Sequence, residues 1–297
     1  MLIANYEADE LLMQTTMASC KRKYTLKLES GATYPLGRKY TRGGRFSSKA
    51  VEEALAKLNK HKVTNYTIEC DLTYQDMNLA SFLMEKQIRK VWKLTGVDRI
   101  DFWLGPSDGS NFRFKSAVTA PYKSNRQPKP ELLLQLREYL MVKHHAQEII
   151  GYEADDALGI YQKCTTIAVH CDKDIFMIPG KHYNTMKDET VDVVDPGTVF
   201  QEKGSLKGYG CAFFYAQLLM GDKTDTIPSL HKGYGPVHIC SLFANCEREE
   251  DYVQVIKKEY QKHEGDNWIA RLKEQADLVW ICREEGVTGA RYVEKFL

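Results

Sequence analysis

A chain of 297 residues is long enough for one large domain or two smaller ones, and either arrangement can bury a hydrophobic core. Its composition, 43% hydrophobic and 27% charged, is typical of a globular protein. The net charge of +1 argues against a uniformly basic nucleic-acid binder, although a nearly neutral total can combine an acidic cluster with a basic face.

The sequence also argues against several other classes of protein. It contains no run of about 18 apolar residues, so we expect no membrane-spanning helix and no membrane partner. The start, "MLIANYEADELLMQ", lacks the basic and then apolar segments of a signal peptide, which favours a cytoplasmic protein. None of the eight cysteines is spaced as in a zinc knuckle or a redox pair, so we expect reduced thiols.

The first hundred residues predict few elements. Residues 1–18 begin with an apolar run and continue with helical spacing, which predicts a strand and then a helix. Residues 20–63 are polar and rich in Gly, Lys and Arg, which predicts a loop or a small hairpin, with a short serine-capped helix over 47–61. Helical spacing returns over 77–94, and "RIDFWLG" predicts a strand at 99–105.

Helical patterns dominate the rest of the chain. An irregular stretch dense in cations and aromatics precedes a predicted helix over 131–144. The apolar run over 165–178 predicts a strand that leads into acidic residues, and 190–195 predicts another strand. Beyond about residue 206 the patterns are helical. Alternating strands and helices therefore predict an α/β fold with a mostly parallel sheet over 1–205, followed by a helical module over 206–297.

Acidic residues cluster where the predicted strands and helices end or begin. Sites in open α/β sheets lie outside the carboxyl ends of the strands, so the fold would bring the acids that follow strands to one edge. Each group alone has a simpler explanation, as a helix cap, a turn residue or a solvated surface charge. The acids concerned are Glu7, Asp9, Asp108, Glu153, Asp155, Asp156, Asp172, Asp174, Asp222 and Asp225.

Convergence of these acids would require cations between them, because like charges repel. Carboxylates without thiols or a histidine triad favour Mg²⁺, with Mn²⁺ as the alternative. Two such ions about 4 Å apart can hold the attacking and leaving oxygens of a phosphodiester displacement. The acids thus indicate a site for two divalent metal ions.

Two further segments suggest contacts with nucleic acid. "NFRFKSAVTAPYKSNRQPKP" interleaves cations with aromatic rings, which can hold phosphates and stack on bases, although a solvated loop would have the same composition. "SLHKGYGPVHIC" has Lys232, Gly233 and Gly235, where a tight turn between helices can expose backbone N–H groups to a phosphate. Two glycines alone are a weak signal.

Taken in order, these motifs resemble the bacteriophage and bacterial 5′→3′ exonucleases of the flap endonuclease superfamily. The resemblance spans roughly residues 100–245 and rests on "SDGSNFR", "YKSNR", "EADD", "CDKD", "GDKTD" and "HKGYG". It implies a Rossmann-like (PIN-like) nuclease core, an arch-like basic segment at about 112–145 and a helix–three-turn–helix that binds duplex DNA. It also implies metal-dependent cleavage of DNA 5′ ends and 5′ flaps, and of RNA in RNA–DNA duplexes, in a bacterial or phage-infected cell.

The resemblance also implies roles for single residues. From Asp108 onward the acids would hold the metals directly or through water, and Lys123 and Arg126 would be the active-site cations. The 5′ strand would pass Phe112 and Tyr122. Further contacts with DNA would involve Arg113, Lys129, Lys232, Gly233 and Gly235.

The chain departs from the family in three places. The usual aspartate at the end of the first strand is replaced here by Glu7, with Asp9 two residues later, so either could substitute for it. Residues 20–75 match little and would be an insertion. The glycine turn lacks the small apolar residue and the lysine common elsewhere in the superfamily. The resemblance therefore does not decide whether this turn binds a monovalent cation.

Two rival functions remain open at this stage. A ribonuclease could use the same core, although the glycine turn and the helical C-terminal part favour duplex DNA. A DNA-binding protein without catalysis would have no reason to keep acids that repel phosphate in the absence of metal. The acidic set is nearly intact, which favours the nuclease.

Overall fold

The computed structural model describes residues 1–36, 41–42, 45–46, 48–57, 65–74, 76–125 and 129–297. Within them a six-stranded sheet forms the centre of the fold, in the order β11-β10-β9-β1-β7-β8. All adjacent pairs are parallel except β10 and β11, which confirms the predicted mostly parallel sheet. The strands are β1 (Ile3–Glu7), β7 (Arg99–Leu104), β8 (Gln147–Glu148), β9 (Thr166–His170), β10 (Gly180–Asn184) and β11 (Glu189–Val193).

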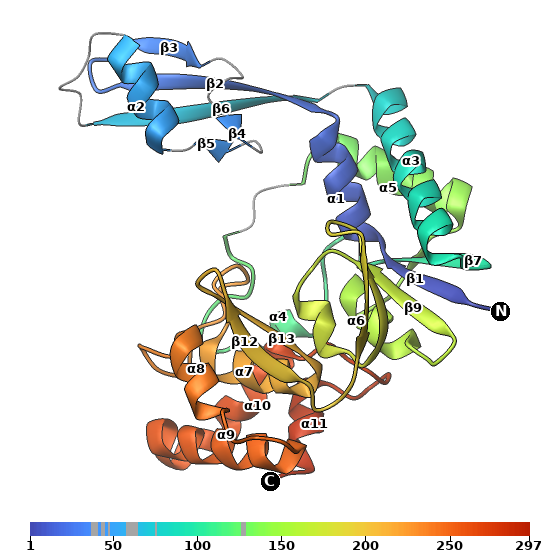
Figure 1. Cartoon of the computed structure of the whole chain (residues 1–297), viewed down its shortest axis with the longest axis vertical. Coiled ribbons are helices and arrows are strands. Elements are labelled where there is room, and N and C mark those ends of the chain that lie inside the picture. The colour runs from blue at the N-terminus through green and yellow to red at the C-terminus, as the bar shows by residue number, and fades with distance from the viewer. Residues whose placement is uncertain (37–40, 43–44, 47, 58–64, 75, 126–128) are drawn as a thin grey trace.

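Helices cover both faces of the sheet (Figure 1), and apolar residues on both faces are buried. In β9, Ile167 and Val169 join a core with the helices of one face, whereas Ala168 joins a second core, as the twofold alternation of a strand requires. The first face is covered by α1 (Ala8–Ala18), α3 (Met77–Thr95) and α5 (Glu131–His144), and α6 (Ala154–Tyr161) belongs to the second.

The second core continues without a break into the C-terminal helices. Helix α7 (Gly210–Met220) is apolar on all sides, as expected of a helix that is buried on all sides. The core also includes residues of α8 (Pro236–Leu242), α9 (Glu249–Glu264), α10 (Trp268–Val279) and α11 (Gly289–Glu294). The C-terminal helices therefore share a core with α6, and their role as a DNA-binding module stays a prediction.

Two other expectations about the core need correction. Strands continue past residue 205, since the hairpin of β12 (Thr198–Glu202) and β13 (Ser205–Tyr209) crosses the predicted boundary. The predicted strand over 165–178 is shorter, because β9 ends at His170 and the 3-10 helix η2 (Asp174–Met177) follows. The helices predicted near 77–94 and 131–144 are confirmed as α3 and α5. Among the described residues, no helix is both long and apolar enough to cross a bilayer.

Residues 20–74 form a separate small unit, which we call the inserted module. A three-stranded antiparallel sheet packs against α2 (Ser48–Lys57), and Tyr24, Leu26 and Leu28 meet Val51 and Leu55 in its own core. The prediction of a loop or a small hairpin for this segment is therefore wrong, whereas the predicted helix is present as α2. The strands are β2 (Cys20–Leu28), β3 (Thr33–Leu36) and β6 (Tyr66–Tyr74), with a two-stranded β4 (Thr41–Arg42) and β5 (Arg45–Phe46) beside them.

Candidate active site

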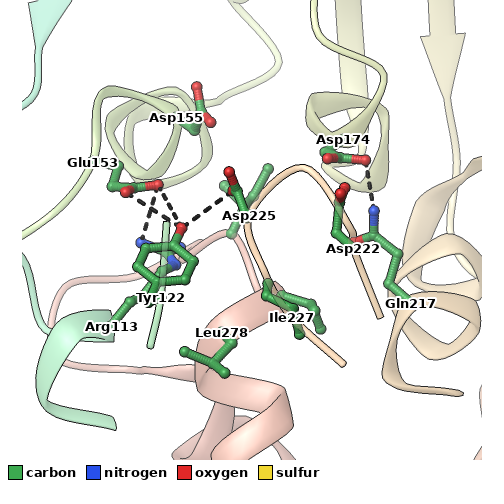
Figure 2. Close-up of a pocket in the computed structure, with 12 residues that line it drawn as sticks. Arg113, Tyr122, Glu153, Asp155, Asp174, Gln217, Asp222, Asp225, Ile227 and Leu278 are labelled. Carbon is green, nitrogen blue, oxygen red and sulfur yellow. Dashed lines mark hydrogen bonds and ion pairs between the residues drawn. The ribbon is translucent and has the colours of Figure 1, made fainter. Parts of the chain in front are cut away.

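Two adjoining cavities lie where β1, β7 and β9 end. The large cavity, about 430 Å³, and the small cavity, about 40 Å³, share Glu153 and Asp155 in their walls. The large cavity is also lined by the acids Glu7, Asp9, Glu10 and Asp172. The small cavity is lined by Asp174, Asp222 and Asp225 as well (Figure 2).

The end of β1 and the start of α1 supply three of the carboxylates. Glu7 is buried and caps α1, because its oxygens accept hydrogen bonds from the backbone N–H groups of Asp9, at 3.0 Å, and Glu10, at 2.6 Å. Asp9 accepts from Gly105 N at 2.9 Å and from Arg137 Nη1 at 3.1 Å. Glu7 and Asp9, the two candidates to replace the family's first-strand aspartate, both line the large cavity, and Glu7 is the more buried of the two.

Glu10 was not anticipated from the sequence. Its carboxylate accepts from the backbone N–H of Cys171 at 2.6 Å and from the Cys171 thiol at 2.9 Å, which links α1 to the loop after β9. Asp172 follows in that loop and accepts from the N–H of Asp174 at 3.0 Å. The sequence did contain a signal for Glu10, because an acid three residues after Glu7 lies on the same side of the helix start.

Glu153 lies between the two cavities and has several donors. Lys123 Nζ is 2.5 Å from Glu153 Oε1, and Tyr122 donates its hydroxyl to Glu153 Oε2 at 3.2 Å. Asn111 Nδ2 donates to Glu153 Oε1 at 3.0 Å, a contact not expected from the sequence. Asp155, in the first turn of α6, lines both cavities.

The small cavity combines acids from two loops. Gln217 Nε2, on α7, donates to Asp174 Oδ1 at 2.6 Å, and Lys173 Nζ lies 3.0 Å from the same oxygen (Figure 2 shows the glutamine contact). Lys173 Nζ is also 3.5 Å from Asp222 Oδ2. Lys173 and Gln217 are thus further site residues that the acidic motifs alone did not indicate.

The loop after α7 brings Asp225 to the basic segment. Asp222 and Ile227 exchange backbone hydrogen bonds of 3.0 and 2.7 Å, which closes a tight turn around Asp225. Lys123 donates its backbone N–H to the carbonyl of Asp225 at 2.9 Å, and its Nζ is 3.7 Å from Asp225 Oδ2. Lys123 is therefore held at two points, as expected of a preorganised cation.

Asp156 and Arg113 require a correction. Their side chains form a buried two-point ion pair, with Arg113 nitrogens 2.6 and 2.7 Å from the two Asp156 oxygens. Asp156 also accepts from the N–H groups of Glu153 and Cys282, both at 2.9 Å. Four donors occupy this carboxylate, so it is a structural anion rather than a metal ligand. Arg113 is 3% exposed and cannot reach DNA.

Asp108 is also placed away from the other acids. Its side chain is exposed in the turn after β7, where it accepts from Ser110 N at 2.8 Å, and it lines neither cavity. The hydrogen bond with Ser110 lowers the pKa of Asp108, as in an Asx turn. Asn111, three residues later, lies at the site instead. The spacing alone could not distinguish these two residues.

The basic segment is placed only in part as expected. Lys123 lies in a turn with a φ of 53°, and Arg126 lies outside the described residues. Tyr122 is 5% exposed, and its ring belongs to the second core. Phe112 also packs against that core, whereas Phe114 is 49% exposed and lines the large cavity with Lys129. Phe114 is therefore the better candidate for stacking.

The glycine turn lies between α7 and α8, as the sequence predicted. Gly233 has a φ of 110°, a conformation that L side chains rarely adopt, and no atom would contact a Cβ there. Gly235 precedes α8 as its cap residue. Lys232 is exposed on the same turn, so this surface is open to a ligand.

Crowding of carboxylates is the main electrostatic feature of the site. Burial, with the charges of Glu10 and Asp155, raises the pKa of Glu7 well above its usual value. Burial, with Asp172 and Glu153, raises the pKa of Asp155 similarly. The pKa of Asp174 rises to about 7, through burial and then the charge of Asp172. These acids would be stabilised by added positive charge.

The donor set fits a hard divalent cation, because every acid that lines the cavities offers carboxylate oxygens. Among the described residues, no three His, Cys, Asp or Glu side chains form a ready-made metal site. Mg²⁺ usually keeps several waters and binds through one or two carboxylates, so its binding does not require three converging ligands. The acids that could hold cations, directly or through water, are Glu7, Glu10, Asp155 and Asp172 around the large cavity and Asp174, Asp222 and Asp225 around the small one.

The raised pKa of Asp174 predicts an unusual pH dependence in the absence of divalent ions. The folded state retains a proton that the unfolded state releases near pH 4, so this contribution to stability is lost as the pH rises from about 4 to about 7. His170 and His182 act with the opposite sign below about pH 6.5, since burial lowers their pKa values.

Comparison with Asp174→Asn isolates the carboxyl from the histidines. In EDTA, the unfolding free energy of wild type minus that of the variant should fall between pH 5 and pH 8, as measured by urea unfolding. A difference that stays constant or grows with pH would contradict this interpretation of Asp174.

No known family model matches this chain, and no curated protein matches it either.

Proposed function

We propose that the chain is a Mg²⁺-dependent nuclease that hydrolyses phosphodiester bonds at the 5′ ends and 5′ flaps of DNA. The observation that carries the proposal is the excess of carboxylates around the two cavities. Nine described acids line them, against three described cations, Arg113, Lys123 and Lys129. Such an excess raises the free energy of the empty site and favours divalent cations.

The charge arrangement argues for phosphodiester chemistry and against simple binding. Carboxylates repel a phosphate unless metal ions lie between them, so a protein that only bound DNA would be hindered by this site. Two bound Mg²⁺ ions would neutralise the acids and the charges that develop on the attacking and leaving oxygens. The 5′ polarity and the preference for DNA rest on the resemblance of the sequence motifs.

Residues of the chain would position the substrate. Lys123, at the border of the two cavities, can contact a non-bridging phosphate oxygen and stabilise the charge that grows there. Phe114 is exposed in the wall of the large cavity and can stack on a base, while Lys129 is exposed nearby and can hold a phosphate. Tyr122 holds Glu153 and Asp225 in place through its hydroxyl.

Dependence on divalent metal is the direct test. With 5′-labelled flap, nicked and single-stranded DNA, we expect cleavage in Mg²⁺ and none in excess EDTA, and circular dichroism should show a folded protein in both. The fold should persist because the acids line cavities rather than the hydrophobic cores. Undiminished cleavage in EDTA, or no cleavage of any of these substrates in Mg²⁺ or Mn²⁺, would overturn the proposal.

A further inference from the structure

The inserted module carries a charge opposite to that of the rest of the chain. Residues 20–74 contain twelve Lys and Arg and five Asp and Glu, a net charge of +7. The remaining residues contain 29 basic and 35 acidic residues, a net charge of −6. The total of +1 therefore conceals a strongly basic unit attached to an acidic body.

The described core of the module does not require this charge. Its core is apolar, with Leu26 fully buried and Tyr24 and Leu28 nearly so. Lys27 Nζ lies 3.0 Å from Glu69 Oε1, but both side chains are about half exposed, and exposed pairs of this kind contribute little to stability. An excess of seven positive charges on a unit of this size is a cost to folding, because the charges repel one another.

The sequence around β4 and β5 concentrates the positive charge. The backbone register of the two strands pairs Arg42 with Arg45. Residues 38–49 contain five Lys and Arg and no acid. A polyanion would relieve the repulsion among the cations of the module, since each phosphate contact neutralises one cation and releases counterions from the nucleic acid.

Helix α1 links the module to the large cavity. Asp9, Glu10 and Met13 line the cavity from this helix, and the module begins directly after its end (Figure 1). An eleven-residue helix is about 16 Å long, which corresponds to about five base pairs of duplex. A nucleic acid that enters the acidic cavity can therefore continue along the module.

We propose that the inserted module binds the sugar–phosphate backbone of the nucleic acid whose end enters the large cavity. The identity of the nucleic acid as the substrate rests on the proposed function. The contact is ionic and independent of sequence, because it depends on charge and uses no defined pocket. It would compensate for the repulsion between phosphate and the carboxylates of the site.

The test measures binding rather than cleavage. We compare wild type, Arg42→Ala/Arg45→Ala, Arg42→Lys/Arg45→Lys and a matched control, Lys163→Ala/Lys181→Ala, which removes two exposed cations, one before β9 and one in β10. Fluorescence anisotropy with a labelled flap duplex in Ca²⁺ gives affinity as a function of salt, and circular dichroism checks folding. The alanine variant should bind about tenfold more weakly at low salt, and its log–log salt slope should fall by about 2.

The lysine variant and the control should match wild type, because charge is retained in one and the module is untouched in the other. Equal affinity and slope for the alanine variant would overturn the module proposal and leave the nuclease proposal intact. If the alanine variant loses binding but wild type shows no cleavage, the module proposal stands and the nuclease proposal is overturned. Absence of DNA binding by wild type would overturn both, and binding of the module to phosphatidylserine vesicles but not DNA would assign it to an anionic membrane instead.

Discussion

Replacing Lys123 with alanine should lower the single-turnover rate of DNA cleavage by about 100- to 1000-fold, the usual effect of removing one preorganised charge contact in a transition state. Affinity for DNA in Ca²⁺ should change much less, because the charge that Lys123 would stabilise develops only in the transition state. The expectation rests on the fixed geometry of Lys123, whose backbone N–H is held by Asp225 and whose Nζ contacts Glu153.

A counter-ion role for Lys123 makes a different prediction. If the lysine only neutralises Glu153 and Asp225, its removal should tighten Mg²⁺ binding, and saturating Mg²⁺ should restore the rate. If it stabilises the transition state, the half-saturating Mg²⁺ concentration should fall, but the maximal rate should stay low. Lys115→Ala, an exposed residue of the same segment that lines neither cavity, is the matched control. A full rate for Lys123→Ala at saturating Mg²⁺ would remove the lysine from the reaction.

The sequence predicted those strands and helices whose apolar residues are spaced by burial in the core. Strand β9 reads as a continuous apolar run because both of its faces are covered, and α5 has the expected bounds. In the inserted module, the inward residues Tyr24, Leu26 and Leu28 alternate with polar ones, but the surrounding cations led to a prediction of a loop. Pairing of β2 with β6 depends on residues about 45 positions apart, which local patterns cannot indicate.

The candidate site shows a similar limit. The strand ends predicted that Glu7, Asp172 and Asp174 would lie near one another, and all three line the cavities, whereas Asp108, which also follows a strand, lines neither. The pattern of acids could not reveal which carboxylate would be matched by a buried cation. Only the folded chain brings Arg113 to Asp156.

Replacing Asp155 and replacing Asp156 should change the free energy of unfolding in opposite directions, although the two residues are adjacent in one motif. In the first turn of α6, one side chain faces the cavities and the other faces the core, because successive residues are about 100° apart around a helix. Burial, together with the charges of Asp172 and Glu153, raises the pKa of Asp155, so the ionised side chain disfavours the folded state. Asp155→Asn should raise the unfolding free energy in EDTA at pH 8 while abolishing most cleavage.

Asp156→Asn should instead destabilise the protein by about 3–5 kcal/mol, because it leaves the buried Arg113 charge without its partner. For a chain of this size, that corresponds to a fall in Tm of very roughly 10 °C. Thermal and urea unfolding in EDTA measure both effects. Arg113→Met/Asp156→Leu should recover much of the lost stability, since a buried ion pair can often be replaced by apolar side chains. If Asp156 were a metal ligand and Asp155 only a helix-start charge, Asp156→Asn would be the stabilising, inactive variant, and the signs would be exchanged.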